Sequence, residues 1–100
     1  MNIDIDKLFQ ELRNRCVSKN VYSVREIAKS MGVNYDFIEL CASMDEEKNE
    51  VLQFCRSSCA CNVMQAGIYN KMPLLDVSKY LTENDDDFAR KSCYETILED

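Results

Sequence analysis

Six cysteines are the most reactive side chains of this 100-residue sequence. Three follow the spacing Cys55-x3-Cys59-x-Cys61, and closely spaced thiolates can bind zinc. On a helix, however, Cys61 points about 200° away from Cys59. The chain has no histidine and no second Cys-x2-Cys pair to complete a tetrahedral site. We therefore favour reduced thiols over a metal site or a structural disulfide. The cysteines expected on buried helical faces are Cys16, Cys41, Cys55, Cys59 and Cys93.

Catalysis is not expected from these residues. Histidine, the usual general base at neutral pH, is absent. Gly32 and Gly67 are the two glycines, so a glycine-rich phosphate loop is absent as well. No neighbour of a cysteine marks a lowered thiol pKa. We predict that the chain is not an enzyme and that it uses neither a cofactor nor a metal.

A binding function is indicated by residues 22–38, whose spacing is typical of a helix-turn-helix unit. Ser23 is a good N-cap, and Glu26 three residues later fits a capping box. Gly32 stands where the turn needs a positive φ, and Asn34 can cap the second helix. Such units usually bind DNA. The residues that would face a DNA groove include Asp36 and Glu39, and these carboxylates argue against strong base reading.

The periodicity of apolar residues predicts an all-α chain. We expect an N-terminal helix-turn-helix unit, then a long helix and two shorter C-terminal helices. Gly67, Asn70 and Pro73 should separate the long helix from the shorter ones. The predicted helices outside the helix-turn-helix cover residues 5–18, 45–65 or slightly beyond, 74–82 and 86–98. Residues 1–44 form the helix-turn-helix-like unit, and residues 45–100 form a region for oligomerisation or partner binding, within one compact domain.

Charge is distributed unevenly along the chain. Residues 1–44 carry equal numbers of basic and acidic side chains, so residues 45–100 account for the whole formal net charge of −6. A nucleic-acid surface therefore belongs to the N-terminal half. The acidic half would repel DNA and would more readily meet protein, although a solvated acidic face without a partner is the alternative.

Three parts of the chain, in this order, resemble the small terminase subunit of tailed phages, of the P22-like type. The first is the helix-turn-helix segment, residues 23–41, which follows an N-terminal helix. The second is the end of the long helix, residues 62–71, with its Ala-Gly-Ile-Tyr-Asn turn. The third is residues 77–88, which are similar to the short closing helix of that family. Together these parts span residues 8–90.

This resemblance implies a ring-forming, non-catalytic factor that binds viral double-stranded DNA and delivers it to the large, ATP-hydrolysing terminase subunit. The implied DNA contacts are Lys19, Arg25, Lys29, Asn34 and Tyr35. The implied contacts between subunits of a homo-oligomer are Phe54, Ser58, Cys61, Gln65 and Tyr69.

Two other functions remain open. A small helical interaction or regulatory protein, such as an inhibitor, would act through its acidic surface, including Asp85, Asp86 and Asp87. A dimeric helix-turn-helix regulator would need a readable operator. The chain begins without the basic and apolar regions of a signal peptide and has no apolar run of membrane-spanning length. We therefore expect a cytoplasmic protein without membrane contact, located in the host cytoplasm if it is phage-encoded.

Overall fold

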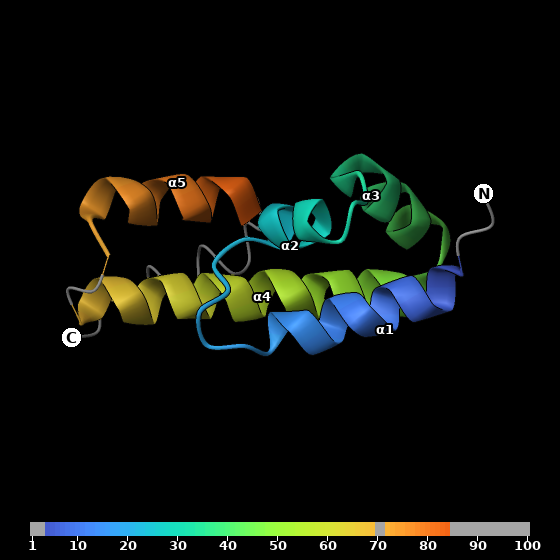
Figure 1. Cartoon of the computed structure of the whole chain (residues 1–100), viewed down its shortest axis with the longest axis horizontal. Coiled ribbons are helices and arrows are strands. Elements are labelled where there is room, and N and C mark those ends of the chain that lie inside the picture. The colour runs from blue at the N-terminus through green and yellow to red at the C-terminus, as the bar shows by residue number, and fades with distance from the viewer. Residues whose placement is uncertain (1–3, 70–71, 85–100) are drawn as a thin grey trace.

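The computed structural model describes residues 4–69 and 72–84, and all regular secondary structure in these residues is helical (Figure 1). This confirms the all-α prediction for the described part of the chain. The helices are α1 (Ile5–Cys16), α2 (Val24–Ser30), α3 (Tyr35–Met44), α4 (Glu46–Ile68) and α5 (Leu74–Asn84). The predicted helix over residues 86–98, and with it Cys93, lies outside the described residues.

Helix α4 is the axis of the structure and contacts each of the other four described helices. Figure 1 shows α1 and α3 beside its N-terminal half and α5 along its C-terminal half. A first core cluster joins α1, α2, α3 and α4, and includes the fully buried Leu12, Ile38 and Cys55. A second cluster joins α4 to α5 through Ala60, Val63 and Leu81. Burial of this apolar surface is what holds the helices on α4.

The turn between α2 and α3 has the local geometry predicted from the sequence. Gly32 adopts φ +73°, a conformation that residues with a Cβ rarely adopt. The Val33 amide donates to the Ala28 carbonyl at 2.9 Å and closes the end of α2. The Oδ1 of Asn34 accepts a hydrogen bond from the Asp36 amide at 2.9 Å, so Asn34 caps α3 as predicted.

Only half of the predicted capping box forms at the start of α2. Ser23 accepts from the Glu26 amide, and it is completely buried. A complete capping box would require the Glu26 carboxylate to accept a hydrogen bond from the Ser23 backbone amide. This carboxylate instead accepts a hydrogen bond from the Tyr80 hydroxyl of α5 at 3.2 Å. Since the ring of Tyr80 also lies 5.7 Å from that of Tyr22, α5 is tied to the start of α2. The sequence prediction failed here because a tertiary partner replaced a local one.

The long helix was predicted to end at Gln65 or slightly beyond, before Gly67, whereas α4 continues through Gly67 to Ile68. Gly67 lies where α5 comes close, and a Cβ added at this position would be 3.1 Å from a methyl carbon of Val77. The glycine therefore serves close helix packing and does not end the helix. Helix α5 begins directly after Pro73 and extends to Asn84, two residues beyond its predicted end.

No helix in residues 4–69 and 72–84 combines the length and the apolar character that a membrane span requires.

Replacement of Gly32 isolates the contribution of its backbone conformation to stability. No atom lies within 4 Å of a Cβ built at this position, so Gly32→Ala meets no steric obstacle from its neighbours. We expect it to lower the free energy of unfolding by about 1–2 kcal/mol because alanine is strained at positive φ. Gly32→Asn should lose less, since asparagine tolerates this region better. Urea unfolding followed by circular dichroism measures both, and equal stabilities for the two variants would contradict this account.

Candidate functional site

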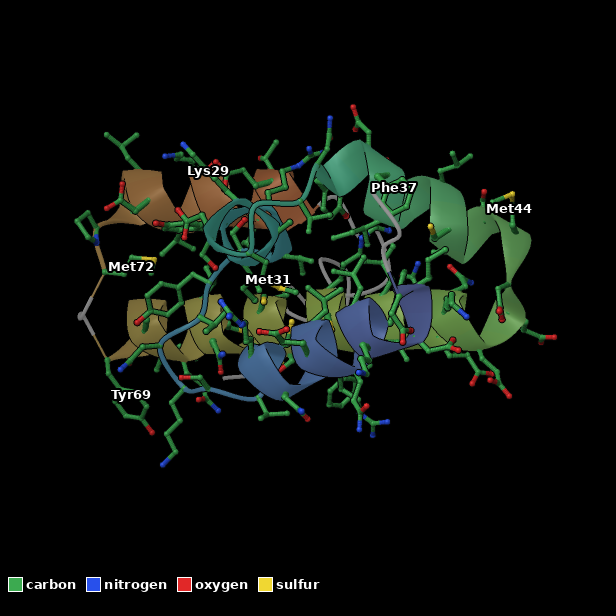
Figure 2. All side chains as sticks on the ribbon, turned by 45° about the vertical axis from the view of Figure 1, so that its right-hand side comes forward. Lys29, Met31, Phe37, Met44, Tyr69 and Met72 are labelled. Atoms are coloured by element: carbon green, nitrogen blue, oxygen red, sulfur yellow. The ribbon has the colours of Figure 1, made fainter. Side chains whose placement is uncertain are left out.

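Lys29 and Asn34 are the predicted DNA contacts that lie exposed on either side of the α2–α3 turn. Lys29 comes from α2 (Figure 2) and makes no ion pair within residues 4–69 and 72–84. The side chain of Asn34 is engaged in capping α3, which leaves its amide NH2 group as its available donor. Both side chains are exposed and offer hydrogen-bond donors, which are the groups that contact phosphate oxygens.

Arg25, another predicted DNA contact, is exposed but held by two neighbours. Its guanidinium carbon lies 4.3 Å from the centroid of the Tyr35 ring, within the range of a cation–π interaction. Its Nε donates to the carbonyl oxygen of Glu83 at 3.2 Å. Arg25 therefore connects α2 to both α3 and α5. Its side chain is still exposed, and the group of Glu83 that it contacts is the backbone carbonyl and not the carboxylate.

Tyr35 is placed differently from what a DNA contact requires. It is 6% exposed, and its hydroxyl oxygen accepts hydrogen bonds from Arg56 Nε at 2.9 Å and Nη2 at 2.6 Å. Arg56 also pairs with Glu39 at 2.9 Å. Burial raises the pKa of Tyr35, while the Arg56 hydrogen bond opposes that rise. These interactions make Tyr35 a packing residue between α3 and α4. The sequence held no signal for its pairing with Arg56, which is 21 positions away.

Lys19 lies apart from the other predicted DNA contacts. It lines a hollow of about 190 Å³ beside the C-terminal half of α4, together with Asn62, Gln65 and Tyr69. The Asn62 side chain donates to the carbonyls of Ser18 and Val21, at 2.9 Å each, and fixes this loop against α4. The structure thus groups Lys19 with residues predicted to contact another subunit.

The five predicted subunit contacts differ in how much of their surface is available. Cys61, Gln65 and Tyr69 are exposed, with Tyr69 at 71%. Phe54 is 42% exposed, and the Arg13 guanidinium lies 5.0 Å from its ring centroid. Ser58 is half-buried and donates to the Cys16 carbonyl at 3.0 Å, so α1 already occupies it. The predicted subunit contacts that remain accessible to another chain are therefore those near the C-terminal end of α4.

An apolar groove between α4 and α5 adjoins that end. It has a volume of about 310 Å³. Its lining residues are Met64, Gly67, Ile68, Met72, Leu74, Val77 and Leu81. Leu74 and the neighbouring Leu75 are 83% and 84% exposed. Both leucines lie in the helix predicted over residues 74–82, but nothing in the sequence singled them out as part of a surface.

The thiol chemistry agrees with the expectation of buried, free cysteines. Cys16, Cys41, Cys55 and Cys59 are buried, whereas Cys61 is exposed, as their helical spacing predicted. A hydrogen bond with Cys55 lowers the pKa of Cys16, but a hydrogen bond with Cys59 and burial outweigh it and raise that pKa to about 12. A hydrogen bond with Cys16, followed by burial, raises the pKa of Cys55 far above its usual range. No group of metal-ligating side chains suited to a metal ion occurs in the described ranges.

Comparison of the chain with protein-family models, with curated protein sequences and with solved structures finds no match.

The raised pKa values of Cys16 and Cys55 predict a loss of stability in alkaline solution. In the unfolded chain a thiol ionises near pH 9.0, while the folded protein keeps Cys16 protonated up to about pH 12. Above pH 9 the folded state therefore binds more protons than the unfolded state. The free energy of unfolding should then fall as pH rises, with a slope approaching about 1.4 kcal/mol per pH unit for each thiol.

Urea unfolding between pH 7 and pH 10 under reducing conditions measures this slope. The matched variant is Cys16→Ala/Cys55→Ala, which should be less stable at pH 7 but should lose less stability between pH 9 and pH 10. A variant with the same slope as the wild type would show that other groups cause the decline.

Proposed function

We propose that this chain is a non-catalytic DNA-packaging factor of the small-terminase type, which binds double-stranded DNA as a homo-oligomer and delivers it to a large terminase subunit. The observation that supports this best is the order of the described helices. The segment that carries the first part of the resemblance forms two capped helices, α2 and α3, joined at Gly32. The 23-residue α4 and the shorter α5 follow. In this proposal α2 and α3 act as a helix-turn-helix unit in the cytoplasm of the host.

DNA binding in this proposal depends on phosphate contacts more than on base reading. Lys29 and Arg25 offer positive charge on α2, and Asn34 offers an amide beside them. The Tyr35 ring holds the Arg25 guanidinium in place by a cation–π interaction. Tyr35 makes no contact with DNA in this proposal. Two cations give a weak site, but several copies in an oligomer, possibly a ring, would act on one duplex together.

Self-association in this proposal uses the C-terminal end of α4 and the groove beside α5. Leu74, Leu75 and Tyr69 are large apolar or aromatic side chains that are more than two-thirds exposed. Exposed apolar side chains gathered beside an apolar groove are typical of a contact surface. The position of Lys19, Gln65 and Tyr69 around one hollow would place a basic residue at the edge of this contact.

A second candidate function is that of a helical interaction protein that acts through an acidic surface. One observation favours it. The outward side of α3 exposes Asp36 and Leu40, neither of which offers the side-chain donors that commonly read bases. The stretch Asp85 to Asp87, on which the sequence-based form of this hypothesis depended, lies outside the described residues.

The DNA proposal predicts that Arg25→Gln/Lys29→Gln weakens duplex binding by at least tenfold at low salt. The plot of log affinity against log salt should also become shallower, by about 0.9 for each DNA phosphate that the variant no longer neutralises. Fluorescence anisotropy with a labelled duplex measures both quantities. The charge-matched control is Lys7→Gln/Lys79→Gln, which removes two exposed cations outside the α2–α3 turn. Equal weakening in both variants would mean that net charge alone attracts DNA, and unchanged binding would refute the assignment of Arg25 and Lys29.

The self-association proposal predicts a solution mass several times that of the 11.6 kDa chain. Light scattering on a sizing column under reducing conditions gives this mass. Leu74→Ser/Leu75→Ser should reduce it, because serine removes the apolar area that a second subunit would cover. Val17→Ser, at a position that is 62% exposed near the end of α1, is the control and should leave the mass unchanged. A wild-type protein that is monomeric at high concentration would overturn the proposal.

A further inference from the structure

A surface at the opposite end of the molecule from the α4–α5 groove combines exposed apolar and acidic side chains. We call it the acidic end and define it by Asp6, Leu40, Met44, Asp45, Glu46 and Glu47. Figure 2 shows Met44 at one end of the structure and Tyr69 and Met72 at the other. Leu40 and Met44, one helical turn apart on α3, are 55% and 72% exposed. Their exposure leaves a continuous apolar strip on α3 uncovered in the described structure.

A hollow of about 380 Å³ lies beside Met44, where the start of α1, the end of α3 and the start of α4 meet. Its lining residues are Ile5, Asp6, Cys41, Met44, Asp45 and Lys48. A cavity of about 150 Å³ in an engineered protein holds a benzene ring, so this hollow has room for a large apolar side chain. Ile5, Cys41 and Met44 would surround such a side chain with apolar atoms, while carboxylates stand at its edge.

The acidic end keeps an excess of negative charge. Lys48 Nζ lies 3.0 Å from Asp6 Oδ1 and 2.9 Å from Asp45 Oδ2, so one ammonium group is shared by two carboxylates. Glu46 and Glu47 are exposed in the first turn of α4 and form no ion pair with any of the described residues. Their position near a helix N-terminus is favourable for the helix dipole, which accounts for their presence on α4. It does not account for the exposed Leu40 and Met44 on α3.

We propose that the acidic end docks a basic amphipathic helix of a protein partner. One large apolar side chain of that helix fills the hollow next to Met44, and a second packs on Leu40. Lysine or arginine side chains beside them pair with Glu46, Glu47 and the exposed carboxylate of Asp6. Charge complementarity selects this occupant, because the same carboxylates repel DNA phosphates and acidic peptides. The inference goes beyond the DNA-packaging proposal and uses none of its residues.

The test uses the full chain and a fluorescently labelled helical peptide in which leucines at helical spacing alternate with lysines. A twin peptide with glutamate in place of every lysine keeps the apolar face and reverses the charge. Fluorescence anisotropy at about 0.15 M salt, where exposed charges still attract over roughly 8 Å, should show saturable one-to-one binding of the lysine peptide. Binding of the glutamate peptide should be at least tenfold weaker.

Two variants of the acidic end then test where the lysine peptide binds. Leu40→Ser/Met44→Ser should weaken binding at least tenfold, and Glu46→Gln/Glu47→Gln should weaken it about threefold to tenfold. The controls lie away from the acidic end: Val17→Ser removes an exposed apolar side chain near the end of α1, and Asp76→Asn/Glu83→Gln removes two carboxylates of α5. Both controls should bind as the wild type does. The two variants of the acidic end change only exposed side chains of α3 and α4, so circular dichroism should show unchanged helix content.

Three results would overturn the proposal. Equal weakening by the control variants would mean that the peptide binds without preference for the acidic end. Binding that requires glutamate in the peptide would reverse the assigned charge complementarity. A lower solution mass for Leu40→Ser/Met44→Ser, together with no peptide binding to the wild type, would mean that a second copy of the chain covers this surface. The variant Arg25→Gln/Lys29→Gln separates this proposal from that of DNA packaging, because it should lose duplex binding and keep full peptide binding.

Discussion

The rest of the described structure depends on one helix that different partners bury along its length. Helix α4 contributes to both core clusters: its Cys55 and Cys59 belong to the first, and its Ala60 and Val63 belong to the second. The small side chains of Cys59 and Ala60 are adjacent and both almost completely buried. They let neighbouring helices approach α4 closely where the two clusters meet. A larger residue there would separate the helices and force both clusters to repack.

A polar cluster complements this apolar packing by adding defined contacts between helices of the first core and by linking them to α5. Arg25 lies over the Tyr35 ring and reaches the backbone of α5, while Arg56 of α4 shares its donors between Tyr35 and Glu39. Arg25 from α2 and Arg56 from α4 therefore both contact the side chain of Tyr35. Because each donor has a defined acceptor, the cluster fixes the relative positions of α2, α3 and α4 more strictly than apolar contacts would. Tyr80 extends the same connection from α5 to Glu26.

The features that could be predicted from the sequence are those determined within a few residues. Asn34 as a cap, the positive φ of Gly32 and the burial pattern of Cys55, Cys59 and Cys61 all follow from spacing along one helix or turn. The features that were missed require a partner from elsewhere in the chain. Tyr80 takes the carboxylate of Glu26, and the approach of Val77 explains why Gly67 continues a helix. The surfaces were harder still to predict, because the exposure of Leu40 or Leu74 depends on where the other described helices pack and not on local spacing.

The length of α4 has a consequence for how many partners the chain can hold. Its 23 residues extend about 35 Å at a rise of about 1.5 Å per residue. The acidic end lies at its first turn and the apolar groove at its last, so a partner helix on one surface leaves the other free. The two surfaces are also too distant for a substitution at one to disturb the other directly. In the two proposals above, α4 would therefore act as a spacer that sets a separation of about 35 Å between the partners at its ends.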